Sequence, residues 1–184
     1  MGATKLRVKV ASEDWELERV NDLNYRTFVE EIPQHSPNPE RRLVDARLAH
    51  SVCYVCLDGQ RLRGMVAICG RRPFSLDAKI ERLDDFLPPH RRPCEVRLLA
   101  VEKDDRGSAV FIALMGALLR HARENGYDLA VLSGARSQLH LYNHMGCVPI
   151  GPPLGTEAAP YQGMYLTWDR VSPAMLRRMR EDAA

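Results

Sequence analysis

Residues 94–108, which read CEVRLLAVEKDDRGS, constrain the fold more than any other part of the chain. Cys94 to Val101 is a mostly apolar run typical of a buried strand, and a short charged turn leads from it to Gly107 and a long helix. A helix start presents unpaired amides and the positive end of its dipole, so this junction favours an anion such as a phosphate. Glu95 lies within the strand, so the stretch also offers a candidate base near the anion site.

The whole chain, residues 1–184, is expected to form a single α+β domain. Its length is sufficient for one domain with a substantial core, and no repeat or linker divides it. Apolar periodicity and turn residues predict strands over 5–10, 51–57, 61–69, 94–101, 129–133, 148–150 and 161–168. They predict helices over 12–32, 41–50, 77–86, 108–125, 136–145 and 172–182.

Composition argues against several classes of protein. The formal net charge of +2 gives no indication of a nucleic-acid or membrane-surface partner. We find no apolar run of about 20 residues and no signal-peptide pattern, so a cytoplasmic protein is expected. The five cysteines lie in or beside predicted strands and are expected to be reduced. Cys53 and Cys56 would point to opposite faces of a strand, and no second ligand pair follows, so no metal site is expected.

Three motifs together resemble the GNAT superfamily of acyl-CoA N-acyltransferases. They are the strand from Glu95 to Val101, the segment RGSAVF over residues 106–111, and the helix end LYNHMGC over residues 141–147. Their order, spacing and element types agree with the family, and the resemblance covers most of residues 12–168. It implies a mixed, twisted sheet of six to seven strands flanked by helices, in which the strands splay after the central one.

The resemblance also implies how an acyl donor is held. Backbone groups of Leu99 and Val101 would pair with the pantetheine arm of acetyl-CoA or a longer acyl-CoA. The diphosphate would lie over the amides of a loop made by Arg106, Gly107, Ser108, Ala109 and Val110. Ala109 and Phe111 stand where the family usually has small cradle residues, which predicts weaker or altered diphosphate binding.

Two side chains are the candidate catalytic groups. Glu95 occupies the family's frequent general-base position, and burial on a strand raises the pKa and basicity of a carboxylate. The alternative is that Glu95 forms a salt bridge with Arg97, which follows two residues later on the same strand face. Tyr142 matches the tyrosine that protonates the leaving thiolate, and its alternative role is a hydrogen bond to a backbone carbonyl.

The upstream half resembles the branch that contains N-acyl amino acid synthases and acyl-homoserine-lactone synthases. The residues that carry this resemblance are the segment YRTFVEE over 25–31, Asp45, Gly64 and Arg97. The first segment and the loop over residues 34–38 would form the wall for the acceptor, with Arg26 for a carboxylate, Glu30 or Glu31 for an ammonium, and Phe28 beside them. The alternative is a solvated amphipathic helix. The six histidines share no spacing and are expected at the surface or behind the site.

These residues predict an N-acyltransferase that moves an acetyl or longer acyl group from a CoA thioester to the amine of a small molecule, such as an amino acid. The amine would attack directly, with a general base and a general acid. One alternative is a synthase of N-acyl amino acids or acyl-homoserine lactones that takes its acyl group from an acyl carrier protein. A second alternative is a non-catalytic module that binds acyl-CoA and regulates.

Overall fold

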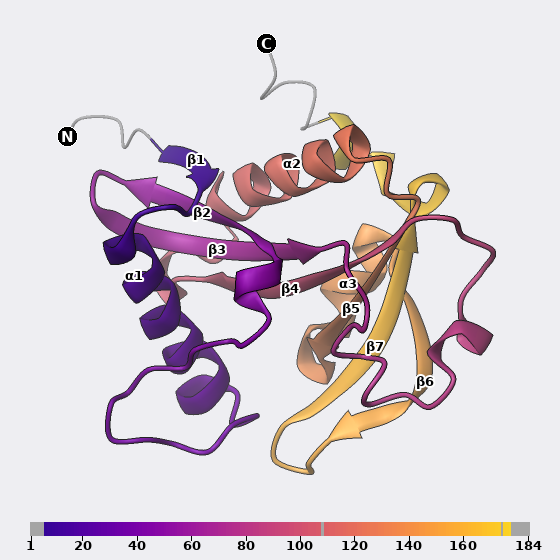
Figure 1. Ribbon diagram of the computed structural model, residues 1–184, viewed down its shortest axis with the longest axis horizontal. Helices are drawn as coiled ribbons and strands as arrows, with labels where there is room; N and C mark the ends of the chain where they lie inside the picture. Colours follow the sequence, from indigo (N-terminus) through magenta and orange to yellow (C-terminus); the bar gives the residue numbers. More distant parts are fainter. Residues whose placement is uncertain (1–5, 108, 174, 178–184) are drawn as a thin grey trace.

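A mixed sheet forms the centre of the computed structural model, which describes residues 6–107, 109–173 and 175–177 (Figure 1). Within these residues seven strands pair in the order β1-β2-β3-β4-β5-β7-β6. Only β4 and β5 run parallel, and the other neighbours are antiparallel. The expected α+β class and strand number are confirmed. The strands are β1 (Leu6–Val10), β2 (Val52–Asp58), β3 (Arg61–Cys69), β4 (Pro93–Val101), β5 (Leu129–Ala135), β6 (Val148–Gly155) and β7 (Pro160–Thr167).

The α-helices that flank the sheet include α1 (Asp14–Tyr25), α2 (Ala109–Glu124) and α3 (Leu139–Met145). The start of α1 is capped by Glu16, whose Oε2 accepts the backbone N–H of Ser12 at 2.9 Å and of Glu13 at 3.2 Å. The chain continues from α1 into a wider π-helical turn, η1 (Arg26–Glu31). Helix α3 ends at Gly146, whose φ of 100° is a conformation that glycine adopts without a steric cost.

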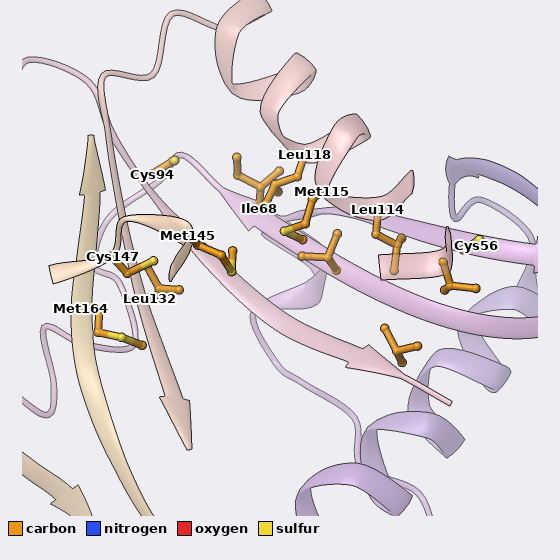
Figure 2. Close-up of a cluster of buried hydrophobic side chains, with 13 residues drawn as sticks. Cys56, Ile68, Cys94, Leu114, Met115, Leu118, Leu132, Met145, Cys147 and Met164 are labelled. Carbon is orange, nitrogen blue, oxygen red and sulfur yellow. The ribbon is translucent and has the colours of Figure 1, made fainter. Parts of the chain in front are cut away.

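Helices α1 and α2 cover opposite faces of the sheet (Figure 1). Figure 2 shows Leu114, Met115 and Leu118 of α2 pointing toward the sheet, where they pack with Ile68 and other buried residues. On the other face, Val20 and Leu23 of α1 pack against β2 and β3. Cys56 belongs to the first cluster and Cys53 to the second, so the two cysteines do lie on opposite faces.

Two expected helices are wrong. Residues 77–86 form turns that lead to a 3-10 helix, η3 (Leu83–Phe86), and Arg82 interrupts any helix there with a φ of 54°. Residues 41–50 form turns and the 3-10 helix η2 (Leu48–His50), because Arg41 has a φ of 50° and the side chain of Asp45 accepts the Arg47 N–H at 2.8 Å. Both segments lie on the α1 side of the sheet and form loops there.

The long connection between β3 and β4 packs on the sheet without a regular helix. Phe74, Leu76 and Ile80 are fully buried against Leu129 and Val131 of β5. This cluster fixes the connection beside α1, on the same face, and leaves a space between them. The remaining short helices are η4 (Lys103–Asp105), η5 (Arg136–Gln138) and η6 (Trp168–Arg170).

The end of the chain agrees in part with the expected helix over 172–182. Pro173 and residues 175–177 are helical, and the N–H of Leu176 donates to the Ser172 carbonyl at 3.1 Å. Residues 174 and 178–182 lie outside the described residues. No helix in the described ranges has the length and apolar character to cross a membrane.

Candidate active site

Strands β4 and β5 part before either of them ends. Their parallel pairing runs from Pro93–Leu129 to Val96–Leu132 and stops there. Strand β4 continues to Val101, and β5 continues to Ala135 while paired only with β7. The ribbons diverge beyond the last pair (Figure 1). The expected splay after the central strand is therefore confirmed, and the end of β4 has one edge without a neighbouring strand.

A β-bulge lies in β4 at the point where the strands part. Arg97 is opposite Ala67 and Ala100 is opposite Met65, so Leu98 and Leu99 together oppose one residue of β3. Leu98 has a φ of 53°, a left-handed conformation that costs a residue with a side chain about 1–2 kcal/mol. The extra residue reverses the alternation of faces. Leu98 packs in the cluster under α1, and Leu99 packs against the cluster under α2.

The backbone of Val101 turns toward the open edge. The N–H of Glu102 donates to the Arg63 carbonyl at 2.9 Å, which makes Glu102 and Arg63 a hydrogen-bonded pair of the antiparallel ladder. The preceding pair, Val101 and Gly64, therefore turns its N–H and C=O groups away from the partner strand. Arg106 Nε reaches the Val101 carbonyl from that side, at 3.3 Å. The open edge is thus lined by backbone groups at the position expected for a donor's arm.

A cavity of about 400 Å³ lies against this part of β4. Its walls come from α1 and η1, the loop around residues 34–47, the connection between β3 and β4, the two parted strands, and α3. Four of the sequence-predicted site residues line it: Phe28, Glu95, Leu99 and Tyr142. Its lining also includes Asn24, His35, Asp45, Arg47, Ser75, Lys79, Arg97, Leu98, Leu132 and Ser133.

Glu95 is 2% exposed and is fully engaged by hydrogen bonds. Its Oε1 accepts the Ser75 N–H at 2.9 Å, the Ser75 hydroxyl at 2.5 Å and the Leu76 N–H at 3.2 Å. Its Oε2 accepts Arg97 Nη1 at 3.1 Å. The salt bridge with Arg97, weighed above as an alternative, is therefore present. Glu95 also anchors the connection between β3 and β4 onto the sheet, and its role as base stays a prediction.

Arg97 links two loops through two carboxylates. Its Nη2 donates to Asp45 Oδ2, and its Nη1 donates to Glu95. The side chains of Arg97 and Asp45 are only 13% and 15% exposed. Asp45 belongs to the loop after α1, and Glu95 holds the connection after β3, so both loops that border the cavity are tied to β4. Two carboxylates against one guanidinium leave this group of three side chains with a net negative charge.

Tyr142 lies in the wall of the cavity with its ring packed on β5. A Cβ at Gly134 would stand 2.2 Å from Tyr142 Cε2, so the ring fits only because residue 134 is glycine. Burial raises the pKa of the Tyr142 phenol to about 12, which keeps the hydroxyl protonated at neutral pH. Among the described residues the hydroxyl has no hydrogen-bond partner, so the alternative bond to a backbone carbonyl is not found there. Its role as acid stays a prediction.

The charged residues predicted for the acceptor wall lie outside the cavity lining. Arg26 forms a two-point ion pair with Glu102, with both N–O distances at 2.7 Å, and this pairing raises the pKa of Arg26. Glu31 binds Arg106 Nη2 at 2.6 Å, and Glu30 binds Arg41 at 2.5 Å. These side chains join α1 and η1 to neighbouring loops. Phe28 alone of the four lines the cavity, carried there by the π-helical turn, a feature frequent at functional sites.

The predicted diphosphate loop lies at the start of α2. Gly107 has a φ of 76°, and a Cβ there would meet nothing within 4 Å, so glycine is required by conformation and not by space. Ala109 and Val110 form the first turn of α2, and Ser108 lies outside the described residues. Arg106 is paired with Glu31 and the Val101 carbonyl. The role of this loop stays a prediction.

Sequence reasoning missed several residues of the cavity. Ser75, Lys79 and Arg47 were not identified as site residues, yet all three line it, whereas the loop over residues 34–38, expected beside the acceptor, does contribute His35. No local pattern marks them, because the contacts that place them join residues far apart, such as Ser75 and Glu95, which are separated by 20 positions. Within the described residues no group of three or more His, Cys, Asp or Glu side chains is arranged to hold a metal ion.

A family model for the N-acyl amino acid synthase FeeM matches residues 19–166, which is most of the chain. The chain belongs to the FeeM N-acyl amino acid synthase family. Members of this family are acyltransferases that act on an amine. The family assignment therefore favours an enzyme over the alternative of a non-catalytic module. A search of curated proteins found no match.

Several solved structures of acyltransferases have folds similar to that of this FeeM-family chain. A CoA-dependent acyl-homoserine lactone synthase, BjaI, solved with SAM and isopentyl-CoA, is 22% identical, covers 90% of this chain and 81% of its own, and has a TM-score of 0.71. FeeM, an N-acyl amino acid synthase from uncultured soil microbes, is 17% identical, with coverage of 94% and 98% and a TM-score of 0.69. An acyl-CoA N-acyltransferase from Pseudomonas aeruginosa is 18% identical, with coverage of 88% and 97% and a TM-score of 0.59. These likenesses show the GNAT-like fold.

Proposed function

We propose that this protein transfers an acyl group from a CoA thioester to the amine of an amino acid or a similar small molecule. The observation that carries the proposal is the open edge of β4. Strand β4 stops pairing with β5 at Val96, and a cavity of about 400 Å³ lies against it from there. An extended ligand can add to such an edge as a further strand, because the backbone groups there need partners.

The thioester arm of the donor would lie along Leu99 and Val101. The amide of Leu99, re-aimed by the bulge, would face the thioester oxygen and stabilise negative charge that develops on it. The diphosphate would lie at the start of α2 over residues 106–110. A CoA thioester is supported by the BjaI structure, which was solved with isopentyl-CoA.

The acceptor amine would approach from the α1 side of the sheet. There the pair formed by Glu95 and Asp45, with Arg97 between them, carries a net negative charge that attracts an ammonium group. The ammonium would first lose one proton to solvent, because only the neutral amine has a lone pair. Glu95 would then take a second proton, directly or through one water, as the amine nitrogen attacks the carbonyl carbon. The C–N bond forms in this step.

Breaking of the C–S bond releases a thiolate, which needs a proton. Tyr142 is suited to donate it, because its hydroxyl stays protonated at neutral pH and lines the cavity. The products are then the N-acyl compound and a free thiol, with one proton moved to Glu95 and one given by Tyr142. Solvent restores both groups after the products leave.

The test is a matrix of donors and acceptors assayed by mass spectrometry. Donors are acetyl-CoA, octanoyl-CoA and octanoyl-acyl carrier protein, and acceptors are the twenty amino acids. Turnover with a CoA thioester supports the proposal, and failure of every combination would overturn it. Glu95→Gln and Tyr142→Phe should each lower kcat by about 10²–10⁴. Ser75→Ala is the control for Glu95, because it loosens the same anchor and keeps the carboxylate; an equal loss of kcat would make Glu95 a positioning residue.

A carrier-protein donor is the second candidate, and one observation favours it. Arg106, the cation of the predicted diphosphate loop, forms an ion pair with Glu31. This ion pair is expected to weaken binding of the diphosphate of CoA. A kcat/KM that is at least about tenfold higher with the acyl carrier protein than with the matched acyl-CoA would establish this second candidate.

A further inference from the structure

We propose that Lys79 binds the carboxylate of the acceptor, so that the enzyme selects amines that also carry a carboxylate. This inference rests on the proposed function, because it names the part of the cavity that recognises the acceptor. It assigns a specificity role to a residue of the irregular connection between β3 and β4.

Lys79 is an exposed residue of the cavity wall, and its ammonium lies over the ring of Tyr161. Its Nζ lies 4.9 Å from the ring centroid of Tyr161, a cation–π contact that favours a fixed position for a long side chain. Tyr161 is itself packed tightly against Gly155, where a Cβ would lie 2.7 Å from Tyr161 Cδ1. Tyr161 pairs with Ala135, the last residue of β5, so Lys79 lies near the end of the parted strand.

Lys79 is a cation of the cavity wall without a carboxylate partner among the described residues. Of the other two cations that line the cavity, Arg97 binds Glu95 and Asp45, whereas Arg47 donates to the Pro73 carbonyl and, like Lys79, has no carboxylate partner among the described residues. An ammonium that borders a cavity and lacks a counter-ion favours an anionic group of the ligand.

Hydrogen bonds connect the carboxylates of the cavity wall to the segment that carries Lys79. Glu95 belongs to β4, Asp45 belongs to the loop after α1, and Lys79 lies on the connection that Glu95 anchors. The N–H of Lys79 donates to the Leu76 carbonyl at 3.0 Å, and the N–H of Leu76 donates to Glu95 at 3.2 Å. A zwitterion satisfies both sites at once, with its amine at the carboxylates and its carboxylate at Lys79.

The experiment compares each acceptor with two analogues that keep the amine. For the best amino acid found in the matrix, the analogues are the amino acid amide and the decarboxylated amine. Wild-type enzyme should prefer the amino acid by about tenfold or more in kcat/KM. Lys79→Met keeps the apolar stem and removes the charge. It should raise KM for the amino acid about tenfold, leave kcat and the donor KM within twofold, and leave the kcat/KM of both analogues within twofold. Lys79→Arg should retain most of the preference.

The control is Arg19→Met, which removes an exposed cation of α1 that has no ion pair among the described residues and lies outside the cavity lining; the preference should be unchanged. Two results would overturn the inference while leaving the proposed function intact: wild-type enzyme that acylates the amide as well as the amino acid, or Lys79→Met that weakens the amino acid and the amide equally. Absence of turnover with every amine would instead refute the proposed function itself.

Discussion

The contact between Gly134 and Tyr142 gives a prediction whose size follows from the structure. A Cβ added at residue 134 would lie 2.2 Å from Cε2, 2.6 Å from Cζ and 2.9 Å from Cδ2 of Tyr142. Carbon atoms pack at about 3.5 Å or more, so the ring has to move by at least about 1 Å. Gly134 is buried in β5, where the backbone is paired with β7 and cannot retreat easily. Gly134→Ala is therefore expected to displace the Tyr142 hydroxyl from its place in the cavity.

The expected effect on catalysis is large compared with the effect on stability. Misplacing a reacting group by about 1 Å lowers the rate about 100-fold, so kcat should fall by that factor. Overpacking should lower the unfolding free energy by about 1–3 kcal/mol, which leaves the protein folded at 25 °C. If Gly134→Ala lowers kcat because it displaces Tyr142, the two substitutions act on the same group. The double variant should then have a kcat at most about threefold lower than that of Tyr142→Phe alone.

The assay is kcat at saturating donor and acceptor for the two single variants and the double variant, with the unfolding free energy measured in urea. The matched control is Gly163→Ala on β7, where a Cβ meets the flexible end of Ile80 at 2.7 Å and does not meet Tyr142. Its kcat should stay within about threefold of wild type. A Gly134→Ala variant with kcat within twofold of wild type, or losses that multiply fully in the double variant, would refute the role given to Tyr142.

Three further predictions follow from the described contacts. Glu95→Gln should lower the unfolding free energy in urea by about 3 kcal/mol, because it breaks a buried ion pair, whereas Ser75→Ala should cost about 1 kcal/mol; equal costs would contradict the network. Stability should fall as pH rises above about 9, because burial raises the pKa of the Cys53, Cys94 and Cys147 thiols to about 12 and the unfolded chain releases these protons first. A urea midpoint that is constant or rises between pH 8 and pH 10.5 would contradict this sign. Arg106→Gln should raise the donor KM and Glu31→Gln, which frees Arg106, should lower it; changes of the same sign in both variants would exclude the proposed contact with the donor phosphates.

The sequence predicts the strands and α2 well because the relevant signals are local, whereas the splay was implied only by the family resemblance. The spacing of apolar residues predicts burial both for the run from Cys94 to Val101 and for one face of α2. The motif around Tyr142 and Gly146 likewise marks the end of α3 within a few residues. These elements, with Glu95, Leu99 and Tyr142 on them, were expected in the positions where the structure has them.

The loops around the cavity could not be predicted because distant residues decide their backbone. Residues 77–86 have the composition of a helix, but the N–H groups of Ser75 and Leu76 are bound by Glu95, and Arg82 is left-handed. The charged residues of η1 show a related failure. Arg26 and Glu31 point to partners in the turn after β4, about 75 positions away, and no spacing in the sequence indicates which face of the helix meets that turn.

The bulge at Leu98 is also invisible in the sequence. A leucine gives no sign of a left-handed backbone, which is usually indicated by glycine or asparagine. A strictly alternating strand would place Leu98 under α2, whereas the bulge places it under α1 and gives Leu99 the opposite face. The tertiary pairing with β3 therefore decides which face of the sheet each of the two leucines occupies.

Hydrogen exchange of the backbone amides at the end of β4 tests the central proposal most directly. The amides of Leu99 and Val101 should exchange at least about tenfold more slowly when octanoyl-CoA is bound, because the open edge of β4 gains a partner. The amides of β2, which already has neighbours on both sides, should be unchanged and serve as the reference. Bound octanoyl-CoA that leaves the exchange of residues 98–101 unaltered would show that the donor is held elsewhere, and would contradict the account.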